Sequence, residues 1–145
     1  MAIGGVGVIV GMWVSDRSSP VTPISTVALN PVLAPGDILR IRYELERTRS
    51  CASQIDRVLF DGEGERYNLE DLSYAAAPGP VGRDGYTVAI PIPSRFAPGR
   101  STYRTVIAYE CNVLHRLWPI IVRGEVPFEV KRPGHGETGS LLQRR

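Results

Sequence analysis

The stretch GDILRIRYELER, residues 36–47, decides the fold class of this chain. Its apolar side chains alternate with charged ones, and a period of two places successive side chains on opposite faces of a strand. The apolar side chains that would share one face are Leu39, Ile41, Tyr43 and Leu45. A helix would distribute these residues around its circumference. We therefore predict a β-strand with one face on a hydrophobic core and the other in water.

Strand signals continue on both sides of this segment, separated by turn signals. The segments that predict strands are residues 25–36, 53–69, 86–93, 101–111 and 117–130, the second being a strand, a glycine-rich turn and a return strand. Pro31 interrupts the first segment, which suits an edge position. Residues 75–85, rich in Pro and Gly, predict a long loop. Short strands with no sustained helical period predict an all-β fold, specifically an antiparallel β-sandwich.

The chain divides into four parts by composition. Residues 1–14 carry no charge and predict an apolar N-terminal anchor or assembly arm, residues 15–25 a Ser/Pro linker, residues 26–130 the sandwich domain, and residues 131–145 a flexible polar tail. The first part is shorter than the roughly 20 residues of a membrane span and lacks the features of a signal peptide. Three interpretations stay open: the end of an anchor that starts upstream, a buried strand or assembly arm, and a short uncleaved anchor.

Length and charge restrict the class of protein. A chain of 145 residues predicts one domain with its own core. Its 43% hydrophobic and 22% charged residues exclude wholesale disorder and a multi-span membrane protein. The net charge is only +2 and the basic residues are scattered, so we expect no nucleic-acid partner.

The segment FAPGRSTYRTVIAYEC, residues 96–111, resembles the tyrosine-corner region of immunoglobulin-like and fibronectin-type domains. Phe96, Pro98, Gly99 and Tyr103 carry the resemblance, which extends over residues 26–130 at the level of architecture. It implies an immunoglobulin-like antiparallel β-sandwich, in which the Tyr103 hydroxyl turns back to bond the loop backbone. It also implies that Tyr103 matters more to stability than Tyr67, which follows an exposed turn.

Cys51 and Cys111 are the only cysteines of the chain. In immunoglobulin domains a disulfide links the second and sixth strands, and the separation of this pair resembles that spacing. The resemblance therefore implies a disulfide, although Cys51 lies beyond the regular alternation of its strand, which favours a bridge near one end of the sandwich. Two reduced, buried thiols are the alternative. A disulfide would place the domain outside the cytoplasm or in an oxidising exterior such as a released particle.

No motif predicts a catalytic residue, a cofactor site or a metal site. The histidines, His115 and His135, lack the short paired spacings of a zinc site, and no nucleophile elbow, phosphate loop or dinucleotide fingerprint occurs. Asp61, Glu63 and Glu65 offer oxygen ligands but lack the rest of a calcium loop. An acidic hairpin turn is the simpler interpretation of that segment.

Residues 112–120, NVLHRLWPI, form the most distinctive loop of the sequence. Their side chains include types that are enriched at interface hot spots. The candidate partner-binding residues are Leu114, His115, Arg116 and Trp118. Packing of Leu117 and Trp118 into the core is the alternative.

These features together favour a non-enzymatic binding or structural module that acts through protein–protein contacts or a homo-oligomeric assembly. The apolar leader and a composition with Lys131 as the only lysine resemble small accessory proteins encoded by bacteriophages or prophages of GC-rich bacteria. The resemblance implies a virion component, or a membrane-anchored protein whose residues 1–14 contact the membrane and whose domain lies outside the cytoplasm. A sandwich-fold enzyme or enzyme inhibitor is the alternative. An exposed apolar patch over loops would favour binding, and a pocket of convergent titratable residues would favour an enzyme.

Overall fold

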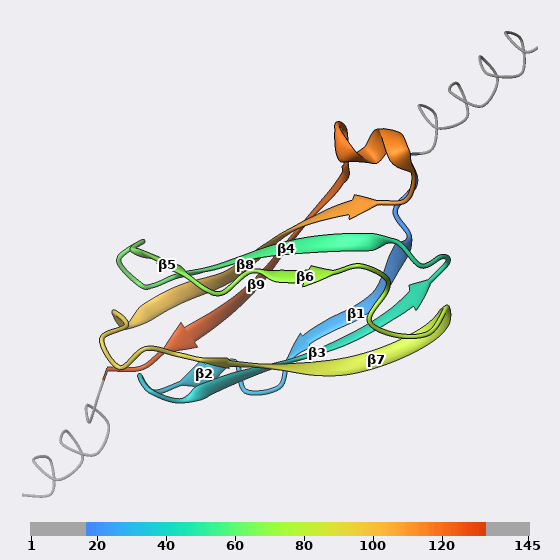
Figure 1. The fold of residues 1–145 in the computed structure, drawn as a ribbon. Helices are drawn as coiled ribbons and strands as arrows, with labels where there is room; N and C mark the ends of the chain where they lie inside the picture. The colour runs from blue at the N-terminus through green and yellow to red at the C-terminus, as the bar shows by residue number, and fades with distance from the viewer. Residues whose placement is uncertain (1–16, 133–145) are drawn as a thin grey trace, which may run out of the picture.

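A computed structural model describes residues 17–132, which form two facing β-sheets (Figure 1). Residues 1–14, where the sequence predicts an anchor or arm, and most of the predicted tail lie outside the described residues. The described part is nearly all β, as predicted, with one short 3₁₀ helix.

The smaller sheet contains three antiparallel strands in the order β1-β3-β7. Their bounds are Val21–Ala28 for β1, Ile38–Arg47 for β3 and Gly82–Pro91 for β7. The strand that the alternation predicts is β3, and its inner face is the predicted one: Leu39 and Ile41 are fully buried and Leu45 nearly so. The alternation continues one step further than the apolar residues, because Arg47 is also buried.

The larger sheet contains six strands. Its order is β2-β9-β8-β4-β5, and β6 also pairs with β4. The bounds are Val32–Leu33 for β2, Ala52–Phe60 for β4, Arg66–Asn68 for β5, Leu72–Tyr74 for β6, Gly99–Glu110 for β8 and Ile120–Val130 for β9. All pairs are antiparallel except β2 with β9, which is parallel.

The chain changes sheets at the predicted break around Pro31. The Leu29 amide still donates to Arg40 of the smaller sheet, whereas the Pro31 carbonyl accepts from Glu129 of the larger one. Proline cannot donate a backbone hydrogen bond, so it suits this transition between two ladders.

Two predicted boundaries differ from the structure. β1 begins at Val21, inside the predicted linker 15–25, and β7 begins at Gly82, inside the predicted loop 75–85. Both extensions pair with the charged end of β3, where Val21 and Gly82 lie on either side of Arg47. The ladder bonds that β3 offers therefore outweigh the weak strand propensity of Ser, Pro and Gly.

The hydrophobic core consists of a large and a small cluster at opposite ends of the sheets. The large cluster contains Leu33, Leu39, Ile41, Leu59, Tyr67, Ile90, Ile92, Phe96, Tyr103, Val126, Phe128 and Val130. The Phe96 ring contacts the rings of Tyr67 and Phe128 at centroid distances of 5.0 and 6.0 Å. The small cluster contains only Cys51, Tyr109 and Ile120 as buried members. We call these the packed end and the cap end.

Candidate functional site

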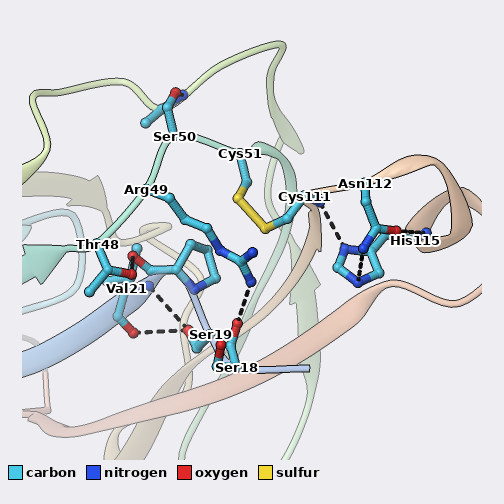
Figure 2. The surroundings of a disulfide bond; sticks show 12 residues. Ser18, Ser19, Val21, Thr48, Arg49, Ser50, Cys51, Cys111, Asn112 and His115 are labelled. Atoms are coloured by element: carbon cyan, nitrogen blue, oxygen red, sulfur yellow. Dashed lines mark hydrogen bonds between the residues drawn. A yellow bond between two sulfur atoms is a disulfide. The ribbon is translucent and has the colours of Figure 1, made fainter. Parts of the chain in front are cut away.

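A disulfide closes the cap end (Figure 2). Cys51 lies just before β4 and Cys111 just after β8, and their sulfur atoms are bonded with the Cα atoms 4.7 Å apart. These strands are neighbours in the larger sheet. The predicted pairing and its place near one end are confirmed. The bridge does not cross between the sheets, however, in contrast to that of an immunoglobulin domain.

The N-terminal residues of the described part lie against the same end. The Arg17 guanidinium donates to the backbone carbonyls of Trp118 and Pro119, at 2.6 and 2.8 Å, and lies 4.0 Å from the centroid of the Trp118 ring. Arg49 donates to the Ser18 carbonyl at 2.9 Å, as Figure 2 shows. The described chain therefore begins beside the loop that contains Trp118.

The cap loop, residues 112–119, contains the 3₁₀ helix η1 (Val113–Arg116). Asn112 caps this helix, since its side-chain oxygen accepts from the amides of Leu114 and His115 at 3.0 and 3.3 Å. The side chain of His115 is buried beneath the loop, where its Nδ1 accepts from the Cys111 amide at 2.8 Å (Figure 2). The shape of the loop is thus fixed by contacts on its inner side.

The predicted partner-binding residues differ in their exposure. Leu117 is 90% exposed and Trp118 56%, so the alternative of core packing does not hold for them. Arg116 is exposed as well, and Leu114 is half-buried. His115, by contrast, is 1% exposed and supports the loop from inside. Its side chain is therefore not accessible to a partner, contrary to the prediction. Val113, which the sequence analysis did not select, is 61% exposed and adds to the apolar surface.

The predicted acidic hairpin lies at the packed end, but its first residue is buried. Asp61 accepts at one carboxylate oxygen from the amides of Glu63 and Glu65, both at 2.9 Å. Its other oxygen accepts from the Tyr67 hydroxyl at 3.1 Å and the Ala97 amide at 3.3 Å. Burial raises the pKa of Asp61, but these hydrogen bonds outweigh burial, and the pKa is lowered. The segment is therefore a structural junction between the hairpin turn and the loop before β8.

This junction replaces the predicted tyrosine corner. Tyr103 is buried, but within the described residues its hydroxyl makes no hydrogen bond to the loop backbone and lies beside Arg57 instead. The tyrosine that contributes to closing the loop is Tyr67, which is 7% exposed and binds Asp61. The turn before Tyr67, residues 62–66, is exposed as expected, but the Tyr67 ring is buried and the turn packs against Pro98. A Cβ atom at Gly62 would lie 1.8 Å from the Pro98 carbonyl oxygen.

A cleft lies between the two sheets on the cap side of the large core cluster. It consists of two adjoining cavities of about 280 and 320 Å³ that share much of their walls. Five of the six tyrosines of the chain line it, namely Tyr43, Tyr74, Tyr86, Tyr103 and Tyr109. The rings of Tyr43 and Tyr86, on neighbouring strands, stack at a centroid distance of 5.3 Å. We call this feature the tyrosine cleft.

An ion pair between a buried arginine and a half-buried aspartate forms part of the wall of the tyrosine cleft. Arg47 is 4% exposed and donates to the carboxylate of Asp84. The hydrogen bond from Arg47 contributes most to lowering the pKa of Asp84, and the bond from the Gly85 amide contributes next. Arg47 was not predicted from the sequence, although the alternation of β3 places position 47 on the inner face.

Metal ligands do not gather in the described part of the chain. Over residues 17–132, no group of three or more His, Cys, Asp or Glu side chains is arranged to hold a metal ion. In the same range, no helix has the length and apolar character needed to span a bilayer.

Comparison with known proteins informs only the fold. No protein-family model and no curated protein sequence matches the chain. Among solved structures, it is similar to Spo0M, a sporulation control protein from Bacillus subtilis, with a TM-score of 0.51 and 7% identity, over 79% of this chain and 50% of that one. A second similar structure is the Pseudomonas fluorescens alkylpurine DNA glycosylase AlkC bound to DNA containing an abasic site analog. Here the TM-score is 0.49 and the identity 14%, over 79% of this chain and 31% of that one.

Proposed function

We propose that this chain is a non-enzymatic binding module whose cap loop contacts a protein partner. The observation that carries the proposal is the exposure of Leu117, at 90%, beside the exposed side chains of Val113 and Trp118. Single exposed apolar residues are ordinary, but several within one loop form the kind of patch that marks an interaction site. Trp is also among the residues that contribute most at interfaces.

The place of the cap loop adds to this proposal. Arg17, the first described residue, contacts Trp118, so the described chain begins at the end of the domain that carries the exposed patch. An attachment segment and a contact loop on one end would act on the same membrane or assembly. We infer that the segment attaches the domain to a membrane or virion and that the cap loop binds a protein there.

We also infer that the domain has the architecture of an immunoglobulin-like sandwich. The smaller sheet, β1-β3-β7, would correspond to strands A, B and E, and β4, β8 and β9 of the larger sheet to strands C, F and G. Two features depart from that family: the disulfide joins neighbouring strands of one sheet, and Tyr67 with Asp61 takes the place of the tyrosine corner.

The test uses the full chain in its native source and chemical cross-linking, which reports contact with a protein separately from attachment through residues 1–14. Replacing both apolar side chains, Leu117→Ser with Trp118→Ser, should reduce the yield of the cross-linked complex with the partner protein by about tenfold. Leu29→Ser is the matched control, because Leu29 is 55% exposed but lies far from the cap loop in the sequence and at the other end of β1. This control should give the same yield of cross-linked complex as the wild type.

Two outcomes would contradict the proposal. The first is an unchanged yield of the cross-linked complex in the cap variant, and the second is an equal loss in Leu29→Ser. A third measurement separates protein from lipid: purified full-length chain is mixed with protein-free vesicles. If the vesicles bind the wild type and not the cap variant, the cap loop contacts lipid and the assignment of a protein partner is wrong.

A further inference from the structure

The tyrosine cleft is independent of the cap loop, and its walls suggest a second binding site. We propose that the cleft binds a small organic acid with a flat apolar body. The proposal rests on the size of the cleft, its aromatic walls, its unpaired hydroxyls and its charge.

The size of the cleft is the first argument. Protein interiors are packed as densely as organic crystals, and voids larger than a water molecule are few. The two adjoining cavities, of about 280 and 320 Å³, approach the range of about 300–1,000 Å³ that is usual for small-molecule sites. They extend from β1 and β9 at one edge of the sheets to β6 and β7 at the other. A molecule of a few rings could enter between the sheets without separating the core.

The walls favour a flat apolar body. The stacked pair Tyr43 and Tyr86 comes from the smaller sheet, while Tyr109 and Ile107 face the cleft from the larger one. Tyr86 remains 40% exposed although it faces the cleft. Aromatic rings stack on other planar groups in offset or tilted arrangements, so an inserted ring system would cover surface that now contacts solvent.

Hydrogen-bond donors are available along the same walls. Within the described residues, the hydroxyls of Tyr43, Tyr74, Tyr86 and Tyr109 make no hydrogen bond to the protein. No fully buried side-chain oxygen or nitrogen of that part of the chain lacks a partner, so these hydroxyls are reachable by solvent. A ligand with acceptor oxygens would therefore find donors already in place.

The charge of the lining favours an acid over a neutral molecule. Its ionisable residues other than tyrosine are four arginines, Arg47, Arg49, Arg57 and Arg123, and two carboxylates, Glu44 and Asp84. The difference, four minus two, leaves an excess of two positive charges. Guanidinium groups bind carboxylates through charge-assisted hydrogen bonds, which are stronger than bonds to neutral acceptors.

One loop covers part of the cleft and indicates where a ligand would enter. Ala77 and Pro78, between β6 and β7, line the cleft, and the Ala77 amide donates to the Ser50 hydroxyl at 2.9 Å. Gly79 fits closely over the Arg47–Asp84 pair, since a Cβ atom there would lie 2.4 Å from an Arg47 nitrogen. The loop thus forms one boundary of the cleft.

The test uses 2-naphthoate as the probe and the full chain with ¹³C-labelled tyrosine rings. We expect saturable shifts of the Tyr43 and Tyr86 ring signals below about 1 mM probe. The Tyr67 signal should stay unchanged, because Tyr67 lies at the packed end and outside the cleft. The neutral 2-naphthamide should bind at least about fivefold more weakly, since it lacks the charge that the arginines complement.

Matched variants locate the binding. Thr105 lines both cavities, so Thr105→Phe should fill the cleft and weaken naphthoate binding about tenfold. Thr87→Phe introduces the same change at an exposed position outside the cleft and should bind like the wild type. If Thr105→Phe does not fold, Tyr86→Ser replaces it, because loss of the stacking surface at this partly exposed residue should weaken binding to a similar extent.

The proposal is overturned if naphthoate causes no saturable shift at Tyr43 and Tyr86, or if the filled variant binds as well as the wild type. Equal affinity for 2-naphthoate and 2-naphthamide would overturn the inference that the ligand carries an acidic group. Because neither Thr105 nor Tyr86 belongs to the cap loop, these results do not depend on whether the cap loop binds a partner.

Discussion

The packed end and the cap end of this domain are closed by different means. At the packed end, Phe96 lies between Tyr67 and Phe128, and Asp61 bonds two loops together. At the cap end, a disulfide and one capped loop close a small cluster, and the sheets leave the tyrosine cleft between them. The tyrosine cleft and an exposed apolar loop are therefore found at the end that contributes least to the core, although the packed end also exposes apolar side chains such as Leu29 and Val32.

This difference suggests a division of labour within one domain. Binding surfaces and cavities reduce stability, because they leave apolar groups in water or side chains without close neighbours. A domain can carry such features where a dense core elsewhere maintains the fold. The disulfide then limits how far the loosely packed end can open.

A matched pair of truncations tests whether the packed end contributes more to stability than the cap end. Phe96→Ala removes a ring that is 2% exposed, and we expect the free energy of unfolding to fall by about 3–5 kcal/mol. Tyr86→Ala removes a ring of the cleft that is 40% exposed, and the loss should be about 1 kcal/mol. Chemical denaturation of both variants measures the difference. Equal losses would show that the two ends contribute alike.

The disulfide gives the next largest effect. The variant with both Cys51→Ala and Cys111→Ala should lose about 2–4 kcal/mol, since the bridge closes a long loop in the unfolded chain. The separation of 60 positions makes this loop much of the domain. Wild-type protein unfolded under reducing conditions should match the double variant. Two freely alkylated thiols in protein taken from its native source would contradict the bridge itself.

A third prediction concerns the pH dependence of the packed end. Because the pKa of Asp61 is lower in the folded protein, its contribution is present above the pKa of the unfolded chain, about 3.9, and is lost as pH falls through the folded value. Asp61→Asn should cost about 1–3 kcal/mol at neutral pH, since its amide group cannot accept all four bonds. The gap to the wild type should shrink below about pH 4.

The measurement for Asp61 is a series of denaturation curves from neutral pH to the acid range. Asp71→Asn, at an exposed side chain, is the control and should follow the wild type at every pH. A gap for Asp61→Asn that stays constant with pH would mean that the charge of the carboxylate makes no contribution.

Strands were predicted best from the sequence where the side chains on one face are all apolar. In β3, every second residue from Leu39 to Leu45 is apolar, and the structure buries that face. The disulfide pair was also predictable, because strand ends could be placed around the only two cysteines. The start of β1 at Val21 was not, since Pro and Ser residues form a strand there only because β3 offers ladder partners.

The features of the candidate sites were harder to predict because they depend on tertiary contacts. Arg47 continues the alternation of β3, but its charge suggests solvent until Asp84 is known to lie opposite. His115 has the composition of an interface residue, yet its ring accepts a bond beneath the cap loop. The tyrosine cleft depends on the distance between the two sheets, and a local pattern of residues does not predict that distance.

The smallest predicted effect compares two tyrosine hydroxyls, both on buried rings. Tyr67→Phe removes a hydrogen bond to the Asp61 carboxylate and should lower the free energy of unfolding by about 0.5–1.5 kcal/mol. Tyr103→Phe removes a hydroxyl that interacts with Arg57 and makes no bond to the loop backbone, so its loss should be smaller than that of Tyr67→Phe. Both rings remain in place, which keeps the change in packing the same and isolates the hydroxyl. If Tyr103→Phe is the more destabilised variant, then a tyrosine corner does stabilise this domain, and the assignment of loop closure to Tyr67 and Asp61 is wrong.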